Sequence, residues 1–118
     1  MASHGLFIGF GFPVRGREQT AAKVFNEMVQ YLTGQIRQGT VESIEPVFLQ
    51  AHGGDLGGFI IVRGDRAKVD AMVATDEFQR NLLRAQLAVE GIGAVNCMLG
   101  DEIQKNMGMF LDAVKEMA

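Results

Sequence analysis

Several residue types that often reveal a function are scarce in this chain. Its 118 residues include no Trp, one Tyr, one Cys, two His and two Pro. With no Trp and a single Tyr, the chain is not expected to form a platform on which nucleic-acid bases stack. A single Cys excludes an internal disulfide and a Cys-x-x-Cys motif. The two histidines, His4 and His52, are far apart, so no paired metal-ligand spacing is present.

Charge and hydropathy show neither a basic patch nor a membrane segment. Eleven Lys and Arg stand against 14 Asp and Glu, a net charge of -3, so nucleic acid is not an expected partner. No apolar run approaches the roughly 20 residues that span a bilayer. The first residues lack the basic start and cleavage site of a signal peptide. We therefore expect a single cytoplasmic domain over residues 1–118, with no membrane partner.

Apolar periodicity predicts four strands and three helices. The strands are expected at residues 6–12, 41–52, 57–63 and 91–99. The helices are expected at residues 18–38, 66–89 and 101–118. Thr75 or Asp76 is expected to interrupt the second helix by capping a fresh segment. Pro46 cannot donate to a ladder, so its strand is expected at an edge, whereas the first strand is expected to be central and covered on both faces.

The stretch QAHGGDLGGFIIVRGD, residues 50–65, raises the question of a phosphate loop. A phosphate loop follows a strand and opens a helix, because helix N-terminal amides bind the anion. Here the glycines lie between two predicted strands, which predicts a hairpin with Asp55 in a turn. The glycines that could take a positive φ in this hairpin are Gly53, Gly54, Gly57 and Gly58. Whether the hairpin is a mobile lid or a tight turn is left open.

A few polar side chains are candidates for chemistry. His52 is expected at a strand end and titrates near neutral pH. Glu45 is expected either on a solvated face or paired with Arg63 of the neighbouring strand. If that pair lined a cavity, Glu45 could act as a base and Arg63 could bind an anion. A metal site is not expected, since the remaining ligands are scattered and His4 lies near an N-terminus expected to be mobile.

Sulfur-containing residues indicate packing, not reactivity. Cys97 lies in the apolar segment AVNCMLG and is expected to be a buried, inert thiol. Four of the seven methionines lie late in the chain, at positions 98, 107, 109 and 117. Methionine fills irregular gaps and adaptable interfaces. The terminal helix could therefore pack across a dimer or within its own subunit, and both alternatives stay open.

The order strand–helix–strand–strand–helix–strand over residues 6–99 resembles the ferredoxin-like fold. With its added terminal helix the chain looks like the dimeric α+β barrel superfamily, and the segment GDRAKVDAMVATDEFQRNLLRAQLAVEGIGAVNCMLGDEI is similar to small bacterial members without assigned function. The resemblance implies an α+β domain with a four-stranded antiparallel sheet and a homodimer or higher oligomer. It also implies a ligand cavity between sheet and helices. Haem-degrading members use an Asn, Trp and His set, and the missing Trp argues against that activity.

The leading hypothesis is a small oligomer that binds a partly apolar small molecule without a cofactor. The expected ligand-binding residues are Phe7, Gly9, Phe48, Phe59, Arg63 and Asn96, with His52 beside them. One alternative is a cofactor-independent monooxygenase or isomerase acting on an aromatic or polyketide-like compound. In it, His52 or Glu45 would be catalytic and move the proton, while Arg63 or Asn96 would stabilise an oxyanion. The other alternative is an assembly module without a ligand.

Overall fold

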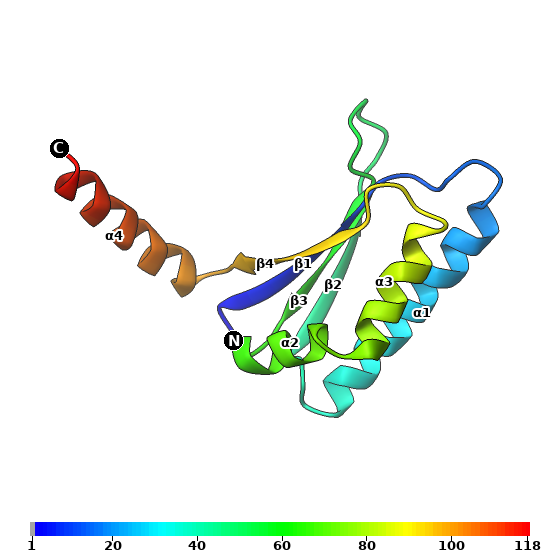
Figure 1. The fold of residues 1–118 in the computed structure, drawn as a ribbon, viewed down its shortest axis with the longest axis horizontal. Helices are drawn as coiled ribbons and strands as arrows, with labels where there is room; N and C mark the ends of the chain where they lie inside the picture. Colours follow the sequence, from blue (N-terminus) through cyan, green and yellow to red (C-terminus); the bar gives the residue numbers. More distant parts are fainter. Residues whose placement is uncertain (1) are drawn as a thin grey trace.

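The computed structural model describes residues 2–118 and has a two-layer body from which a C-terminal helix extends (Figure 1). Its elements, in chain order, are β1 His4–Phe10, α1 Glu18–Arg37, β2 Ser43–Phe48, β3 Gly58–Arg63, α2 Arg66–Val73, α3 Asp76–Gln86, β4 Gly93–Met98 and α4 Asp101–Glu116. The strands form one sheet in the order β2-β3-β1-β4, and every neighbouring pair is antiparallel. This confirms the predicted α+β, ferredoxin-like arrangement with an extra terminal helix.

Local sequence signals place the elements as predicted. Pro46 lies in β2, which is an edge strand, and β1 is central. The predicted second helix is divided into α2 and α3, because the Thr75 hydroxyl accepts a hydrogen bond from the Phe78 amide at 3.2 Å and starts α3. The Asp65 carboxylate caps α2 in the same way, through the Lys68 amide. Strand β2 is shorter than predicted and ends at Phe48, so His52 lies in the loop that follows.

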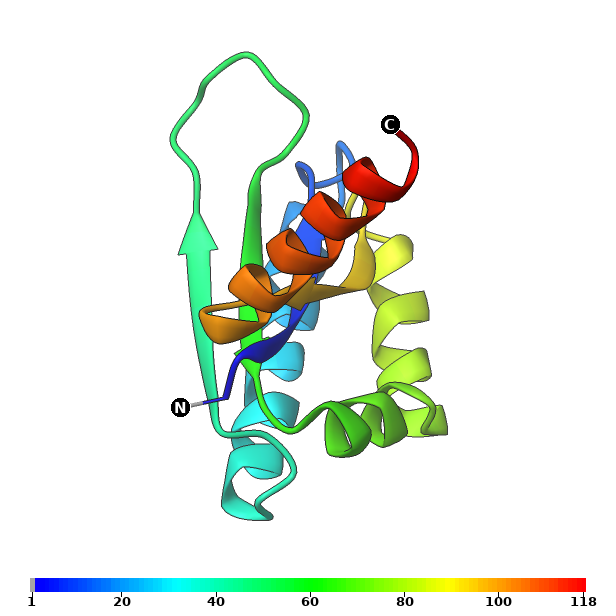
Figure 2. The same cartoon turned by 90° about the vertical axis from the view of Figure 1, so that its left-hand side faces the viewer.

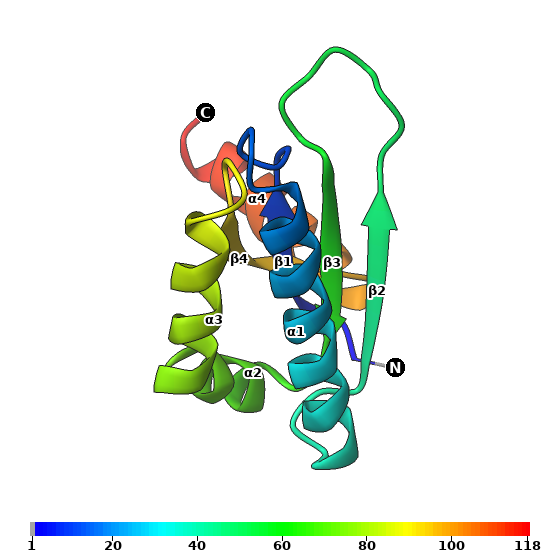
Figure 3. The same ribbon diagram turned by 90° about the vertical axis from the view of Figure 1, so that its right-hand side faces the viewer.

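The core lies between the sheet and the helices α1, α2 and α3, which cover one face of it (Figure 3). The sheet contributes Leu6, Ile8, Ile60 and Val62, and the helices contribute Met28, Leu32, Val69, Met72 and Phe78. Each of these side chains is at most 5% exposed. At about 1.5–3 kcal/mol for a fully buried large apolar side chain, this layer contributes most of the stability of the body.

No helix of residues 2–118 packs against the other face of the sheet, which we call the open face (Figure 2). Side chains alternate along a strand, so the strand register assigns a defined set of side chains to it. These are Phe7 of β1, Glu45 and Val47 of β2, Phe59, Ile61 and Arg63 of β3, and Val95 and Cys97 of β4. The expectation that β1 is covered on both faces is therefore met on one face only within this chain.

Helix α4 leaves the end of β4 and extends away from the body, on the side of the open face (Figures 1 and 2). None of its residues is buried within the described chain. The predicted apolar stripe consists of Ile103, Met107, Phe110, Leu111 and Val114, which are 48–59% exposed. Of the two alternatives for this helix, packing within its own subunit is not what the structure shows.

His4 corrects the expectation of a mobile N-terminus. It belongs to β1, pairs with Met98 of β4 and is only 5% exposed. Neither ring nitrogen has a hydrogen-bond partner among residues 2–118, and the Glu102 carboxylate lies 3.7 Å from Nδ1. The buried imidazole therefore lies beside the first turn of α4.

Candidate functional site

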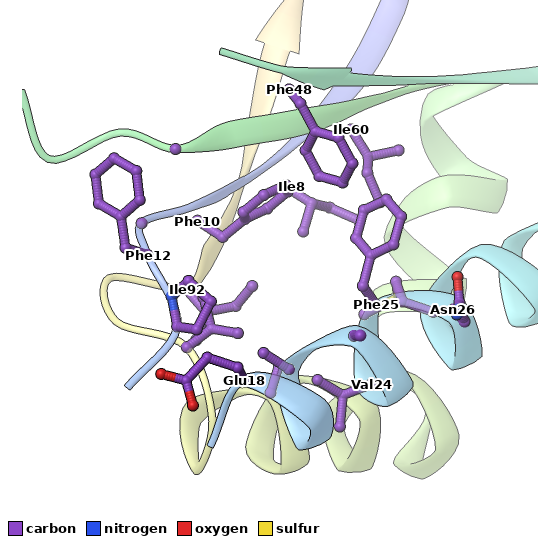
Figure 4. Close-up of a pocket in the computed structure, with 18 of the residues that line it drawn as sticks. Ile8, Phe10, Phe12, Glu18, Val24, Phe25, Asn26, Phe48, Ile60 and Ile92 are labelled. Atoms are coloured by element: carbon purple, nitrogen blue, oxygen red, sulfur yellow. The ribbon is translucent and has the colours of Figure 1, made fainter. Parts of the chain in front are cut away.

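A pocket of about 510 Å³ lies between the sheet and helix α1 (Figure 4). The sheet contributes Ile8, Phe10, Phe48 and Ile60 to its wall. Helix α1 contributes Ala21, Ala22, Val24, Phe25 and Met28, and the end of α3 with the following segment contributes Ala85, Val89 and Ile92. The small alanines on the helices face large side chains on the strands, and they leave part of the volume between the two layers unfilled at this end of the core. This volume is within the usual range for a small-molecule site.

Aromatic rings from three elements form one side of the pocket. The ring centroids of Phe25 and Phe48 are 5.0 Å apart, those of Phe10 and Phe25 5.9 Å, and those of Phe10 and Phe48 6.0 Å. Figure 4 shows the three rings gathered at one end of the cavity. Phe48 is 69% exposed and lies on the edge strand β2, so it stands at the opening. Such rings favour a flat aromatic guest through stacked or edge contacts.

The wall of the pocket carries little polarity. Among its lining residues, only Glu18 and Asn26 have polar side chains, and both are exposed. In Figure 4 the Glu18 carboxylate lies at the margin of the cavity. One of its oxygens accepts a hydrogen bond from the Gly16 amide at 3.3 Å. A charged guest would lose its hydration here without gaining a counter-charge inside, so the pocket suits an uncharged molecule.

The rim of the pocket is built from closely packed backbone. The Gly57 amide donates to the Phe10 carbonyl at 2.8 Å, and the Leu49 amide donates to the Gly57 carbonyl at 2.9 Å. A Cβ added to Gly57 would lie 2.6 Å from the Gly11 carbonyl oxygen. Of the four hairpin glycines expected to allow a positive φ, only Gly53 adopts one, at +82°. At Gly57 a glycine is needed because the backbone of Gly11 lies too close to leave space for a Cβ, not because a turn requires a positive φ.

His52 lies in the loop between β2 and β3 and does not line the pocket. Its Nδ1 accepts a hydrogen bond from the Gly54 amide at 3.3 Å, and its Nε2 lies 2.7 Å from the Leu56 carbonyl oxygen. Because Nδ1 accepts and a carbonyl cannot donate, Nε2 carries the proton and donates to Leu56. Both ring nitrogens thus form hydrogen bonds within the loop. The catalytic role of His52 stays a prediction.

Glu45 and Arg63 form the predicted pair on the open face. Arg63 Nη1 lies 3.2 Å from Glu45 Oε1, with the two side chains 25% and 59% exposed. Glu45 is therefore paired with Arg63 and also exposed to solvent in the single chain, so both expected alternatives apply to it. The pair lies on the face of the sheet opposite the pocket. Beside it the rings of Phe7 and Phe59 are 5.2 Å apart. The Phe7 ring occupies the space above Gly9, where a Cβ would collide with it.

The predicted site residues are thus divided among four places, of which the loop of His52 is one. Phe48 lines the pocket, while Phe7, Gly9, Phe59 and Arg63 lie on the open face. Asn96 faces the helices at β4 and donates to the Asp70 carboxylate of α2 at 3.4 Å. Sequence reasoning missed Phe10 and Phe25. The signal was present, since Phe10 shares a strand face with Ile8 and Phe25 lies on the buried stripe of α1.

Cys97 lies on the open face near Gly5 and is half-buried. Burial raises the pKa of its thiol, the Glu102 carboxylate raises it further, and the Arg63 guanidinium acts in the opposite direction. A raised pKa leaves little thiolate at neutral pH, in agreement with the expected inert thiol.

Neither a metal cluster nor a membrane-spanning helix is found in the described part of the chain. Among residues 2–118, no three His, Cys, Asp or Glu side chains are grouped so that they could hold a metal ion. None of the helices there combines the length and the apolar character needed to cross a bilayer.

Comparison with known proteins gives a clear result for the fold. No family model matches the chain, and no curated protein matches it. A dimeric ferredoxin-like protein of unknown function from Thermobifida fusca aligns over 84% of this chain and 93% of its own, with a TM-score of 0.61 and 11% identity. A dimeric protein of unknown function and ferredoxin-like fold from Bacteroides fragilis aligns over 82% and 97%, with a TM-score of 0.58 and 10% identity.

An enzyme is also among the similar structures. SnoaB, a cofactor-independent oxygenase from Streptomyces nogalater, aligns over 84% of this chain and 95% of its own, with a TM-score of 0.59 and 13% identity. At these identities the likeness concerns the fold and not the activity. The chain therefore has the ferredoxin-like fold, which it shares with bacterial proteins of unknown function that are described as dimeric.

Proposed function

We propose that this protein binds an uncharged, largely apolar molecule with at least one aromatic ring in the pocket between the sheet and α1. The observation that carries the proposal is the cavity of about 510 Å³, with Phe10, Phe25 and Phe48 on one side and polar side chains only at its margin. A guest that buries roughly 300 Å² of its own apolar surface and covers about half as much apolar wall would gain about 11 kcal/mol, which leaves about 7 kcal/mol, a Kd of about 10 μM, after association costs of about 4 kcal/mol. Micromolar affinity is the expected outcome.

Binding is a better supported function than acid–base catalysis. SnoaB shows that a chain of this fold can carry out oxygenation without a cofactor. In the present chain, however, the predicted catalytic residues His52 and Glu45 lie outside the pocket wall, and the carboxylate of Glu18 is confined to the margin. A general base must be within hydrogen-bond reach of the proton that it removes. The apolar wall supports holding a guest, not moving its protons.

The proposal includes self-association. Similar structures from Thermobifida fusca and Bacteroides fragilis are described as dimeric. The open face of this chain carries Phe7, Phe59 and Ile61 at its centre and Val95, 60% exposed, beside them. Such a patch on a soluble domain marks an interaction surface. We therefore expect two copies to stack their open faces about 10 Å apart, the usual spacing of packed sheets.

The test uses two fluorescent probes that share one ring system. N-Phenyl-1-naphthylamine is neutral, whereas 1-anilinonaphthalene-8-sulfonate is the same molecule with a negative charge. We expect the wild-type protein to bind the neutral probe with a micromolar Kd and the sulfonate at least about tenfold more weakly, because its charge cannot be solvated in the pocket. Equal affinity for the two probes would contradict an apolar, uncharged site.

A pair of matched variants locates the binding. Ala22 is exposed on α1 and lines the pocket, whereas Ala67 is exposed on α2 and does not. Ala22→Trp places an indole in the cavity and is expected to weaken binding of the neutral probe at least about tenfold. Ala67→Trp adds the same side chain elsewhere and should leave the Kd within about twofold. If both variants bind like the wild type, the probe is bound at another place.

A further inference from the structure

Helix α4 has an apolar stripe that nothing in the described chain covers. Its side chains at positions 103, 107, 110, 111 and 114 lie on one side of the helix, and each is about half exposed. An isolated helix of about 15 residues is marginally stable in water, and most helices depend on packing of an apolar face. A partner for this stripe is therefore needed to keep α4 folded as the structure has it.

The position of α4 indicates where that partner lies. The helix follows β4 after only Leu99 and Gly100, and the Leu99 amide donates to the Ser3 carbonyl at 2.8 Å. It extends on the same side of the sheet as the open face, opposite to α1 and α3 (Figures 1 and 2). A second copy stacked on the open face would lie beside α4. One partner can therefore contact both α4 and the open face.

The polar side of α4 argues against a lipid surface as the partner. The helix carries Asp101, Glu102, Asp112 and Glu116 against Lys105 and Lys115. Helices that lie on anionic membranes are rich in Lys and Arg on their polar face. A net acidic helix would instead be repelled by the anionic cytoplasmic leaflet. Lys105 and Lys115 can form ion pairs with the carboxylates of an identical helix, so the mixed charges are compatible with an interface between two copies.

The area of these surfaces fits an interface between two copies. At roughly 100 Å² for each half-exposed large side chain, the stripe offers about 500 Å² of apolar surface. The rings and aliphatic side chains of the open face supply the remainder of the roughly 800 Å² that each partner buries in a stable complex. The stripe alone does not reach that area, so the open face is needed as well.

We propose that two copies of this chain exchange their α4 helices, each packing its apolar stripe on the other copy while the open faces stack. This inference rests on the self-association proposed above and adds the element that makes it stable. The same surface is used by both copies, so the arrangement is isologous and closes on a two-fold axis. Without the exchange, α4 has no role in the assembly.

The first experiment compares two methionine variants in the full chain. Met107 lies on the apolar stripe and is 50% exposed, whereas Met109 lies on the other side of the helix and is 61% exposed. Met107→Asp and Met109→Asp make the same chemical change with the same helix propensity. Sedimentation equilibrium should show the dimer Kd raised at least about 30-fold by Met107→Asp, because each copy buries a charge. Met109→Asp should change it less than about threefold.

The outcomes separate the exchange from self-association itself. Equal dimer affinity for both variants and the wild type overturns the exchange and leaves stacking of the open faces standing. A wild-type chain that sediments as a monomer at micromolar concentration overturns both. Flotation of the wild-type protein with phosphatidylcholine–phosphatidylserine vesicles, abolished by Met107→Asp, would also overturn the exchange, because the stripe would then bind lipid.

A second experiment asks which copy the helix touches. Benzoylphenylalanine in place of Phe110, which lies on the stripe and is 59% exposed, reports its neighbours by photo-crosslinking. The substituted chain is labelled with nitrogen-15 and mixed with unlabelled wild-type chain. We expect crosslinked peptides that combine one labelled and one unlabelled segment. Crosslinks confined to labelled peptides of a monomeric species would place α4 on its own chain and overturn the proposal.

Discussion

Replacing Gly57 by alanine tests how the rim of the pocket is built. Gly57 follows the loop of the β2–β3 hairpin, and its amide donates to the Phe10 carbonyl at 2.8 Å. A Cβ at this position would lie 2.6 Å from the Gly11 carbonyl oxygen and 3.1 Å from the carbon of the same group. Ordinary contact begins near 3.4 Å, so the two backbone segments must separate by about 0.8 Å.

The magnitude of the effect follows from three contributions. Moving the segments apart weakens the hydrogen bond from Gly57 to Phe10, which contributes about 1 kcal/mol. Overpacking against a backbone that cannot rotate away costs about 1–3 kcal/mol. The alanine also stabilises the folded state by about 0.4–1 kcal/mol, because it lowers the conformational entropy of the unfolded chain. We expect Gly57→Ala to lower the free energy of unfolding by about 1–3 kcal/mol.

The assay is thermal unfolding followed by circular dichroism at equal protein concentration, since association raises the midpoint. For a domain of this size the expected loss lowers Tm by roughly 4–12 °C. Gly34 provides the matched control, because it lies inside α1 and a Cβ there would meet nothing within 4 Å. Gly34→Ala should raise stability by about 1 kcal/mol through helix propensity. A Gly57→Ala variant as stable as Gly34→Ala would refute the reasoning.

Two further perturbations test the helix cap and the thiol. Thr75→Ala removes the side-chain oxygen that accepts from the Phe78 amide at 3.2 Å, so it should cost about 1 kcal/mol in the same assay; exposed Thr20→Ala on α1 should cost less than half of that. Cys97 should react with iodoacetamide more slowly than glutathione does at pH 8, because burial raises its pKa. The unfolded chain ionises this thiol first as the pH rises past its ordinary value of 9.0, so the folded state loses stability between the two pKa values. A Cys97→Ala variant should not show that loss, and an unchanged pH profile would speak against the raised pKa.

Most of the fold follows from local signals in the sequence. Pro46 lacks the amide that a central strand needs, which predicted the edge strand. A cap at Thr75 or Asp76 was expected, which predicted the division between α2 and α3, and the structure shows that Thr75 is the cap. The end of β2 was not predictable from the apolar pattern, because it is set by pairing with another strand. The ladder between β2 and β3 ends at the pair Phe48 and Gly58. His52 was for this reason assigned to a strand end, although its ring bonds within the loop.

The pocket was harder to predict because both faces of β1 are apolar. Alternation separates Phe7 and Gly9 from Ile8 and Phe10, but it does not say which face meets the helices. The β1 residues expected to bind a ligand, Phe7 and Gly9, lie on the face opposite the pocket. In the structure the space above Gly9 is filled by the ring of Phe7 itself. The cavity arises on the other face, where alanines of α1 meet the strands, and only packing of the two layers reveals it.

The direction of α4 depends on one residue. Gly100 precedes the helix with φ +51° and ψ -122°, a conformation that side chains with a Cβ rarely adopt, although a Cβ there would meet no neighbour. A residue with a Cβ is therefore strained at this position, and a backbone change that relieves the strain would change the direction of α4 relative to the body. In a closed pair, each copy packs its helix on the copy whose helix it receives. A helix that points elsewhere would bind a third copy, and repeated contacts of this kind build filaments instead of pairs. If two copies exchange α4 as proposed, the backbone conformation of Gly100 decides whether the assembly closes as a pair or continues as a filament.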